Sequence, residues 1–138
     1  MKPSLEDRKK FDLDLEYGEL REEMIADMLQ NKKVEVKSER GMWTDTGNIA
    51  IEYMCYGKPS GLSTTEADYW FHNLCIDDEI YATIVFPVDN LKKIIKLMDS
   101  YRKVSGGDHN ASKMLLLNIQ SLFDKQLINK FKESLNEA

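Results

Sequence analysis

The spacing of apolar residues changes several times along this chain between a period of two and a period of three to four, and this change restricts the fold most. Alternation predicts strands, and the longer period predicts helices. The segment 80–86 is the richest in β-branched and aromatic residues and predicts a strand. The predicted order is helix, two strands, a short helical turn, two strands, helix, strand and helix. We therefore expect a mixed α/β or α+β fold, with a central mixed sheet flanked by helices.

The element boundaries follow from the same periodicities. Residues 1–10 are expected to form a flexible tail, residues 11–17 a short strand or extended lead-in, and residues 11–138 together a single domain. Residues 103–112 are expected to be a loop. Because the first two strands are close in sequence, they are expected to pair as a hairpin around the loop 39–47. The predicted helices are 19–30, 89–102 and 121–135, and the predicted strands are 33–38, 48–54, 69–75, 80–86 and 114–119.

The composition excludes several classes of protein. The 138 residues include seven Gly, three Pro and two Cys, which excludes collagen-like, low-complexity and disulfide-rich folds. The chain lacks a membrane-spanning apolar run and a secretory signal, so an intracellular, cytoplasmic protein is expected. Residues 61–90 contain six acidic residues and no Lys or Arg, whereas residues 91–138 contain nine basic and five acidic residues. This distribution argues against coating nucleic acid in bulk but is compatible with a local basic strip that meets DNA.

The tripeptide Glu-Val-Lys at 35–37 is the strongest candidate for catalytic chemistry. Alternation puts Glu35 and Lys37 on one face of a strand, about 7 Å apart. Carboxylate oxygens bind hard cations, and an ammonium group beside the cation stabilises charge on a phosphate. In the expected hairpin, Glu52 lies diagonally from Glu35 on the same face, and Glu22 borders the apolar stripe of the first helix. The alternative interpretation is that all of these residues are solvated surface charges.

Two turn-rich loops, 43–48 and 57–61, flank this face and offer backbone donors and hydroxyl groups. Such loops suit contacts with a phosphate backbone, although ordinary turn chemistry also explains each of them. The residues expected to contact DNA are Arg40, Asn48, Lys58, Ser60 and Thr65.

Six short motifs lie between residues 17 and 70. They are Tyr17-Gly18, Glu22, Val34-Glu35-Val36-Lys37, Thr46-Gly47-Asn48-Ile49-Ala50-Ile51-Glu52, Gly57-Lys58-Pro59-Ser60-Gly61 and Thr64-Thr65-Glu66-Ala67-Asp68-Tyr69-Trp70. Together they resemble small phage-encoded proteins of the PD-(D/E)XK nuclease superfamily, most of all its Holliday-junction-resolvase-like branch. The resemblance covers about residues 11–103 and implies a restriction-endonuclease-like core that binds one or two magnesium ions.

Carried over by position, the resemblance implies that Glu22, Glu35 and Lys37 are catalytic. The family's upstream Asp has no matching position, and Glu52 is expected to replace it. The implied function is Mg²⁺- or Mn²⁺-dependent hydrolysis of branched or replicating phage or host DNA, as an endonuclease or exonuclease. Glu22, Glu35 and Glu52 would be the metal ligands, and a homodimer would suit junction cleavage. The alternative is a catalytically degenerate nuclease-fold protein that binds DNA or another protein.

Overall fold

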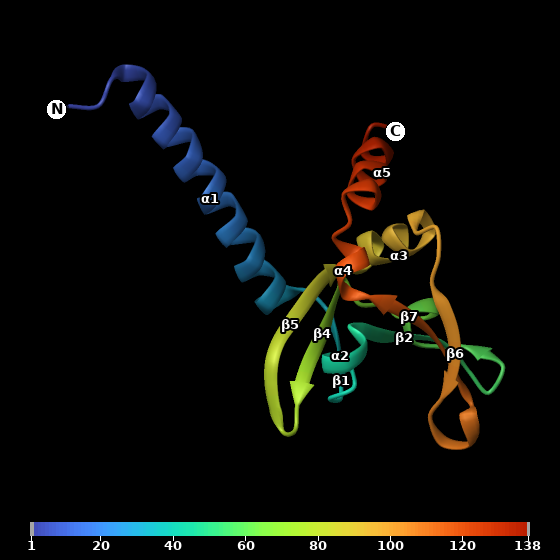
Figure 1. The fold of residues 1–138 in the computed structure, drawn as a ribbon. Coiled ribbons are helices and arrows are strands. Elements are labelled where there is room, and N and C mark those ends of the chain that lie inside the picture. Colours follow the sequence, from blue (N-terminus) through green and yellow to red (C-terminus); the bar gives the residue numbers. More distant parts are fainter. Residues whose placement is uncertain (1, 138) are drawn as a thin grey trace. The chain divides into compact units, whose positions relative to one another are not determined.

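The computed structural model describes residues 2–137, and the chain divides into two compact units, one up to Lys33 and the other from Val34 onward (Figure 1). The first unit is dominated by one helix, α1 (Leu5–Asn31). At its start, the Ser4 hydroxyl accepts a hydrogen bond from the Asp7 backbone N–H, and the Asp7 carboxylate accepts one from the Ser4 N–H. These hydrogen bonds with Ser4 hold the pKa of Asp7 below its usual value, because they favour the charged carboxylate. The reciprocal cap defines where the helix begins.

α1 begins earlier than the sequence predicts. The predicted helix over 19–30 is confirmed, but the expected tail over 1–10 and the extended segment after it are helical from the cap onward. The local alternation is misleading here, because Leu13 and Tyr17 also continue the spacing of four and three residues that leads to Leu20. The helix continues through Gly18, although glycine is a poor helix former.

The second unit contains two β-sheets, whose strands except β3 are labelled in Figure 1. The three-stranded sheet has the order β1 (Val34–Glu39), β4 (Tyr69–Ile76) and β5 (Glu79–Pro87), with β1 parallel to β4 and β5 antiparallel to it. The antiparallel four-stranded sheet has the order β3 (Lys58–Pro59), β2 (Asn48–Cys55), β7 (Ser112–Asn118) and β6 (Arg102–Gly106). The predicted mixed α+β class is confirmed, but the strands are divided between two sheets instead of forming a single central one.

The helices of the second unit connect and flank these strands. They are α2 (Trp43–Thr46), α3 (Val88–Leu97), α4 (Ile119–Leu122) and α5 (Lys125–Leu135), with 3₁₀ turns η1 (Gly61–Ser63) and η2 (Asp108–Asn110). The predicted helix over 89–102 is confirmed as far as Leu97, but the loop expected after it contains β6. The predicted helix over 121–135 is interrupted at Asp124, whose side chain caps α5 by accepting from the backbone of Gln126. Within residues 2–137, no helix is long and apolar enough to cross a membrane.

β1 and β2 do not pair with each other, so the predicted hairpin is wrong. β1 pairs with β4, and β2 pairs with β3 and β7. The loop expected at 39–47 instead contains α2, which ends at Gly47 in the left-handed backbone conformation (φ 71°). Trp43 Nε1 donates a hydrogen bond to the carbonyl oxygen of Cys75 in β4, 2.8 Å away. The hydrogen bond of Trp43 attaches α2 to β4 of the three-stranded sheet. The segment between β1 and β2 is therefore a helix and not the turn of a hairpin.

One hydrophobic core joins the two sheets and α3. Its buried members are Ile49, Ile51, Leu62, Trp70, Leu74, Phe86, Val88, Leu91, Ile95, Leu115, Leu117 and Leu122. β2 contributes Ile49 and Ile51, and these residues pair with Leu117 and Leu115 of β7. Because side chains alternate along a strand, the residues between them lie on the other face of the sheet. That second face carries Glu52.

Candidate functional site

Strand β1 carries its charged residues on the face that it shares with buried residues of β4. In the parallel register, Glu35 lies beside Trp70 and Lys37 beside His72, and both partners are at most 1% exposed. The two valines of β1 are instead 43% and 54% exposed. Inward charges protect an edge strand from pairing with other chains. Charged residues on the more covered face and valines on the more exposed face reverse the usual pattern of a strand, so β1 is a candidate site.

A buried hydrogen-bond chain runs along this face. The Trp70 indole Nε1–H donates to Nδ1 of His72 over 3.1 Å, and Nε2 of His72 lies 2.9 Å from Oε1 of Glu39. Because an indole N–H is only a donor, Nδ1 must accept, and the proton of the neutral imidazole then lies on Nε2. His72 therefore donates to Glu39, and Trp70 fixes the tautomer in which it does so.

Glu39 and His72 were not among the predicted site residues. Glu39 had a signal in the sequence, because it extends the Glu-x-Lys alternation by one more step, just beyond the predicted strand 33–38. His72 had none, because a single His in an apolar strand does not reveal its partner. The contact joins residues that are 33 positions apart and depends on the pairing of β1 with β4.

Lys37, Glu39, Glu52 and His72 line one cavity of about 260 Å³, together with Ser38, Ala50 and Met114. Glu39 connects the two sheets here, since its Oε1 also accepts a hydrogen bond from the backbone N–H of Ala50 in β2. Lys37 and Glu52 thus share a cavity although their strands belong to different sheets.

Glu35 lies beside the cavity rather than among the residues that line it. Its Oε1 is 3.6 Å from Nζ of Lys37, and both side chains are partly exposed. An ion pair of this exposure contributes only about 0–1 kcal/mol to stability. The ion pair places a carboxylate beside the ammonium group of Lys37.

The donor set of the cavity fits a cation that is shared with a substrate. Mg²⁺ in phosphate-processing sites is usually held by one or two carboxylates, and water and phosphate oxygens complete its coordination. Glu39 and Glu52 supply two carboxylates, and both hydrogen bonds of Glu39 fall on Oε1, not on Oε2. Across residues 2–137, no three His, Cys, Asp or Glu side chains form a group that could hold a metal ion by themselves. The residues thus fit an open, substrate-completed site better than a closed structural one.

The other predicted site residues have varied surroundings. Glu22 is an exposed residue of α1 in the first unit, and its role as a metal ligand stays a prediction. Arg40 and Lys58 are exposed. Asn48 is hydrogen-bonded across β2 and β7, and Thr65 accepts a hydrogen bond within the turn that follows it, so both have local structural roles. Their contacts with DNA also stay predictions.

The glycine-containing loop at 57–61 has a packing role. Gly57 (φ 73°) lies in the turn between β2 and β3, and Gly61 (φ 53°) begins η1. A Cβ atom on Gly61 would clash with the backbone carbonyl of Glu52. Among the described side chains, the buried Ser60 Oγ lacks a hydrogen-bond partner. Gly61 therefore allows η1 to lie directly against the strand that carries Glu52.

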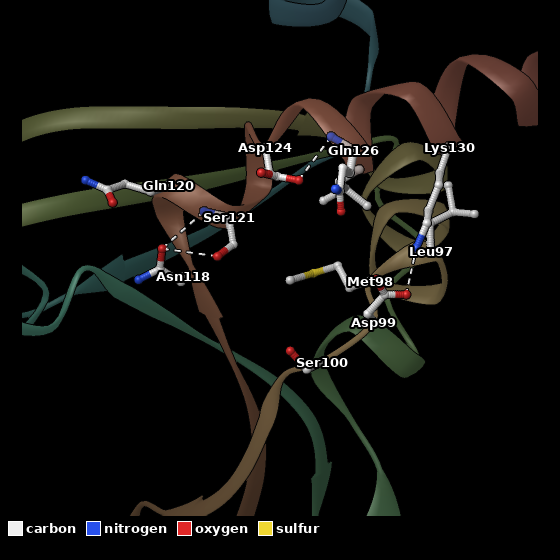
Figure 2. Close-up of a pocket in the computed structure, with 11 residues that line it drawn as sticks. Leu97, Met98, Asp99, Ser100, Asn118, Gln120, Ser121, Asp124, Gln126 and Lys130 are labelled. Atoms are coloured by element: carbon white, nitrogen blue, oxygen red, sulfur yellow. Dashed lines mark hydrogen bonds and ion pairs between the residues drawn. The ribbon is translucent and has the colours of Figure 1, made fainter.

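A polar cavity of about 330 Å³ lies between the end of α3, the end of β7 and the start of α5 (Figure 2). Asn118 caps α4 by accepting from the Ser121 backbone, and Asp124 caps α5. Lys130 Nζ is 2.6 Å from Oδ1 of Asp99 at one side of the cavity. Its polar groups thus have structural tasks, and it is a weaker candidate than the cavity around Lys37.

No protein-family model matches the chain, and comparison with curated proteins and with solved structures finds no match either. The resemblance to PD-(D/E)XK nucleases thus depends on the sequence motifs, and the chemistry depends on the cavity around Lys37.

Proposed function

We propose that the protein is a deoxyribonuclease that hydrolyses phosphodiester bonds with the help of Mg²⁺ or Mn²⁺. The observation that carries the proposal is the cavity that Lys37, Glu39 and Glu52 line together. Membership of the PD-(D/E)XK superfamily, with a restriction-endonuclease-like core, is part of the proposal. It is supported by the chain order of a helix, a strand with Glu-x-Lys and a mixed sheet in which β1 is parallel to β4.

The charged side chains and the histidine of the cavity have distinct tasks in this proposal. The ammonium group of Lys37 stabilises the negative charge that develops on the phosphate oxygens, and Glu35 orients it. Glu39 and Glu52 hold the cation. When bound, the cation supplies an activated water molecule and neutralises charge on the phosphate. His72 is a positioning residue, because it holds Glu39 through Nε2 and is itself held by Trp70.

The proposed substrates are branched or replicating DNA of a phage or its host. Junctions contain paired scissile bonds, so a homodimer is part of the same proposal. Sedimentation of the purified chain tests the dimer independently of cleavage.

The test is cleavage of a labelled four-way DNA junction and of a linear duplex by the purified full chain. We expect cleavage in 5 mM Mg²⁺ or Mn²⁺, none in EDTA, and a large loss in Lys37→Ala and Glu52→Gln. Matched controls are Lys125→Ala and Glu133→Gln, which change exposed residues of α5 and should cleave at the wild-type rate. Equal cleavage by Lys37→Ala and Lys125→Ala would overturn the proposal.

A second candidate is a catalytically degenerate nuclease-fold protein that binds DNA or a protein partner without cutting. It is favoured by the lack, within residues 2–137, of a group of three side chains that could hold a metal ion alone. In that case the wild-type chain would bind the junction but leave it intact in every divalent cation tried.

A further inference from the structure

A second cavity of about 300 Å³ lies on the opposite face of β2 and β7 from the site around Lys37. Met114 lines the first cavity, and the next residue of β7, Leu115, lines the second. Glu52 and Tyr53 of β2 divide in the same way, because neighbouring residues of a strand point to opposite faces. The residues that line it are Tyr53, Leu62, Ser63, Lys92, Ile95, Lys96, Tyr101, Lys103 and Leu115.

The charge of this groove is one-sided. Lys92 and Lys96 are one turn apart on α3, and Lys103 comes from β6. Of the described residues that line the groove, none is Asp or Glu. Like charges gathered without a carboxylate repel one another, and an anion bound among them relieves that repulsion.

The floor of the groove is apolar and aromatic. Leu62, Ile95 and Leu115 are buried members of the core, and Tyr53 packs against the same core. Tyr101 is 39% exposed and stands at the edge of the groove. Duplex phosphates alone would need the lysines but not this floor. A base stacked on aromatic rings with its phosphates on lysines is how proteins hold unpaired strands.

We propose that this groove binds an unpaired nucleotide segment of a DNA strand. The base lies over Tyr101, Tyr53 and the apolar floor, and the flanking phosphates contact Lys92, Lys96 and Lys103. The choice of DNA rests on the proposed function, whereas binding in the groove does not require cleavage. A volume near 300 Å³ is at the lower end of ligand sites and suits a single base. The groove therefore favours substrates with unpaired bases, such as flaps and open junctions.

The probe is a fluorescein-labelled dT₁₂ oligonucleotide, with an abasic strand of the same length as the comparison, measured by fluorescence anisotropy in EDTA. The wild-type chain should bind dT₁₂ at least about tenfold more tightly than the abasic strand, because the abasic strand has no base to stack on the tyrosines. Tyr101→Ala should lose about tenfold of affinity for dT₁₂ and little for the abasic strand. Tyr81→Ala is the control, since Tyr81 is exposed on β5 and packs against Trp43.

The lysines are tested by salt dependence. Lys92→Gln with Lys96→Gln should reduce the slope of log affinity against log salt by about 1.4, because two phosphate contacts are lost. Lys93→Gln is the matched control, because Lys93 Nζ lies 5.5 Å from the centre of the Phe131 ring and does not line the groove. Both variants change exposed or half-buried side chains, and thermal melting checks that each is folded.

Each result decides for or against the groove. Equal affinity of Tyr101→Ala and Tyr81→Ala for dT₁₂ would overturn the proposal. Equal salt dependence of binding in the double lysine variant and in Lys93→Gln would also overturn it. Binding to phosphatidylglycerol vesicles that is lost in the double lysine variant, without binding to dT₁₂, would assign the groove to a membrane surface and also overturn it. Failure of the nuclease proposal is recognised separately, since then no junction is cut while dT₁₂ binding still depends on Tyr101.

Discussion

The two cavities on either side of β2 and β7 differ in chemistry although they share the same two strands. The cavity around Lys37 is lined by two glutamates and a buried imidazole, and one of the glutamates, Glu39, accepts hydrogen bonds from His72 and from the Ala50 backbone. The groove beside α3 contains three lysines and two tyrosines over an apolar floor. Neighbouring residues, Glu52 and Tyr53, thus serve opposite sides of one strand. The comparison teaches that alternation lets one strand supply both a candidate reaction site and a candidate substrate groove.

The largest expected effect is on the free energy of unfolding. Substitutions in the cavity around Lys37 should lower it, whereas substitutions in the lysine groove should not. His72→Phe removes the acceptor of Trp70 and the donor to Glu39, so we expect a loss of about 3 kcal/mol in the free energy of unfolding. Urea denaturation measures it. Glu39→Gln keeps an acceptor oxygen and should lose less, about 1 kcal/mol.

The lysine pair of the groove provides the contrast. Lys92→Gln with Lys96→Gln should change the unfolding free energy by no more than about 0.5 kcal/mol for each position. If His72→Phe proves as stable as wild type, the buried hydrogen-bond chain does not hold the cavity together.

The second prediction separates cleavage from binding. Lys37→Ala should slow single-turnover cleavage by about 10²-fold, a typical loss for one electrostatic group, with little change in dT₁₂ affinity. Arg at position 37 should rescue poorly, because a planar guanidinium does not replace a compact ammonium group. The double lysine variant should show the reverse, with weakened dT₁₂ binding and a near-normal rate at saturating DNA. Parallel losses of rate and affinity in both variants would mean that the two cavities are not distinct in function.

The third prediction concerns the loop that supports β2 between the cavities. Gly61→Ala should be less stable than Gly57→Ala by about 2 kcal/mol, because only the first adds a clash to the cost of a positive φ. Thermal and urea unfolding of the two variants provide a matched comparison. Gly61→Ala should also lower cleavage, because its methyl group displaces the backbone of Glu52. Equal stability of the two variants would argue against close packing of η1 on β2.

The smallest expected effect is stabilisation by a cation. At ten times the dissociation constant, Mg²⁺ should raise the free energy of unfolding by about 1.4 kcal/mol, measured as an increase in Tm. Glu52→Gln, Glu39→Gln and Glu35→Ala test the contribution of each carboxylate to that increase. The double lysine variant should keep all of it. An equal increase in wild type and Glu52→Gln would mean that the cation binds elsewhere.

The site was predictable in part. Alternation alone placed Glu35 and Lys37 on one face of a strand, because strand periodicity is a local property of the sequence. Glu52 was assigned to the same site through a hairpin that does not form, and the roles of all three residues stay predictions. Glu39 was within reach of the same pattern. His72 and the groove residues could not be predicted from this pattern, because their neighbours in the structure come from distant parts of the sequence.

The sequence by itself determined where most strands lie and that the fold is mixed, because apolar periodicity and β-branched content act over a few residues. It determined only the second half of α1, because the alternation over residues 11–17 predicted an extended segment where the helix already runs. Only the tertiary structure decided that β1 pairs with β4 instead of β2, and that its valines face outward while Glu35 and Lys37 face the buried side. Pairing partners and buried faces depend on the packing free energy of the whole unit, which no local pattern contains.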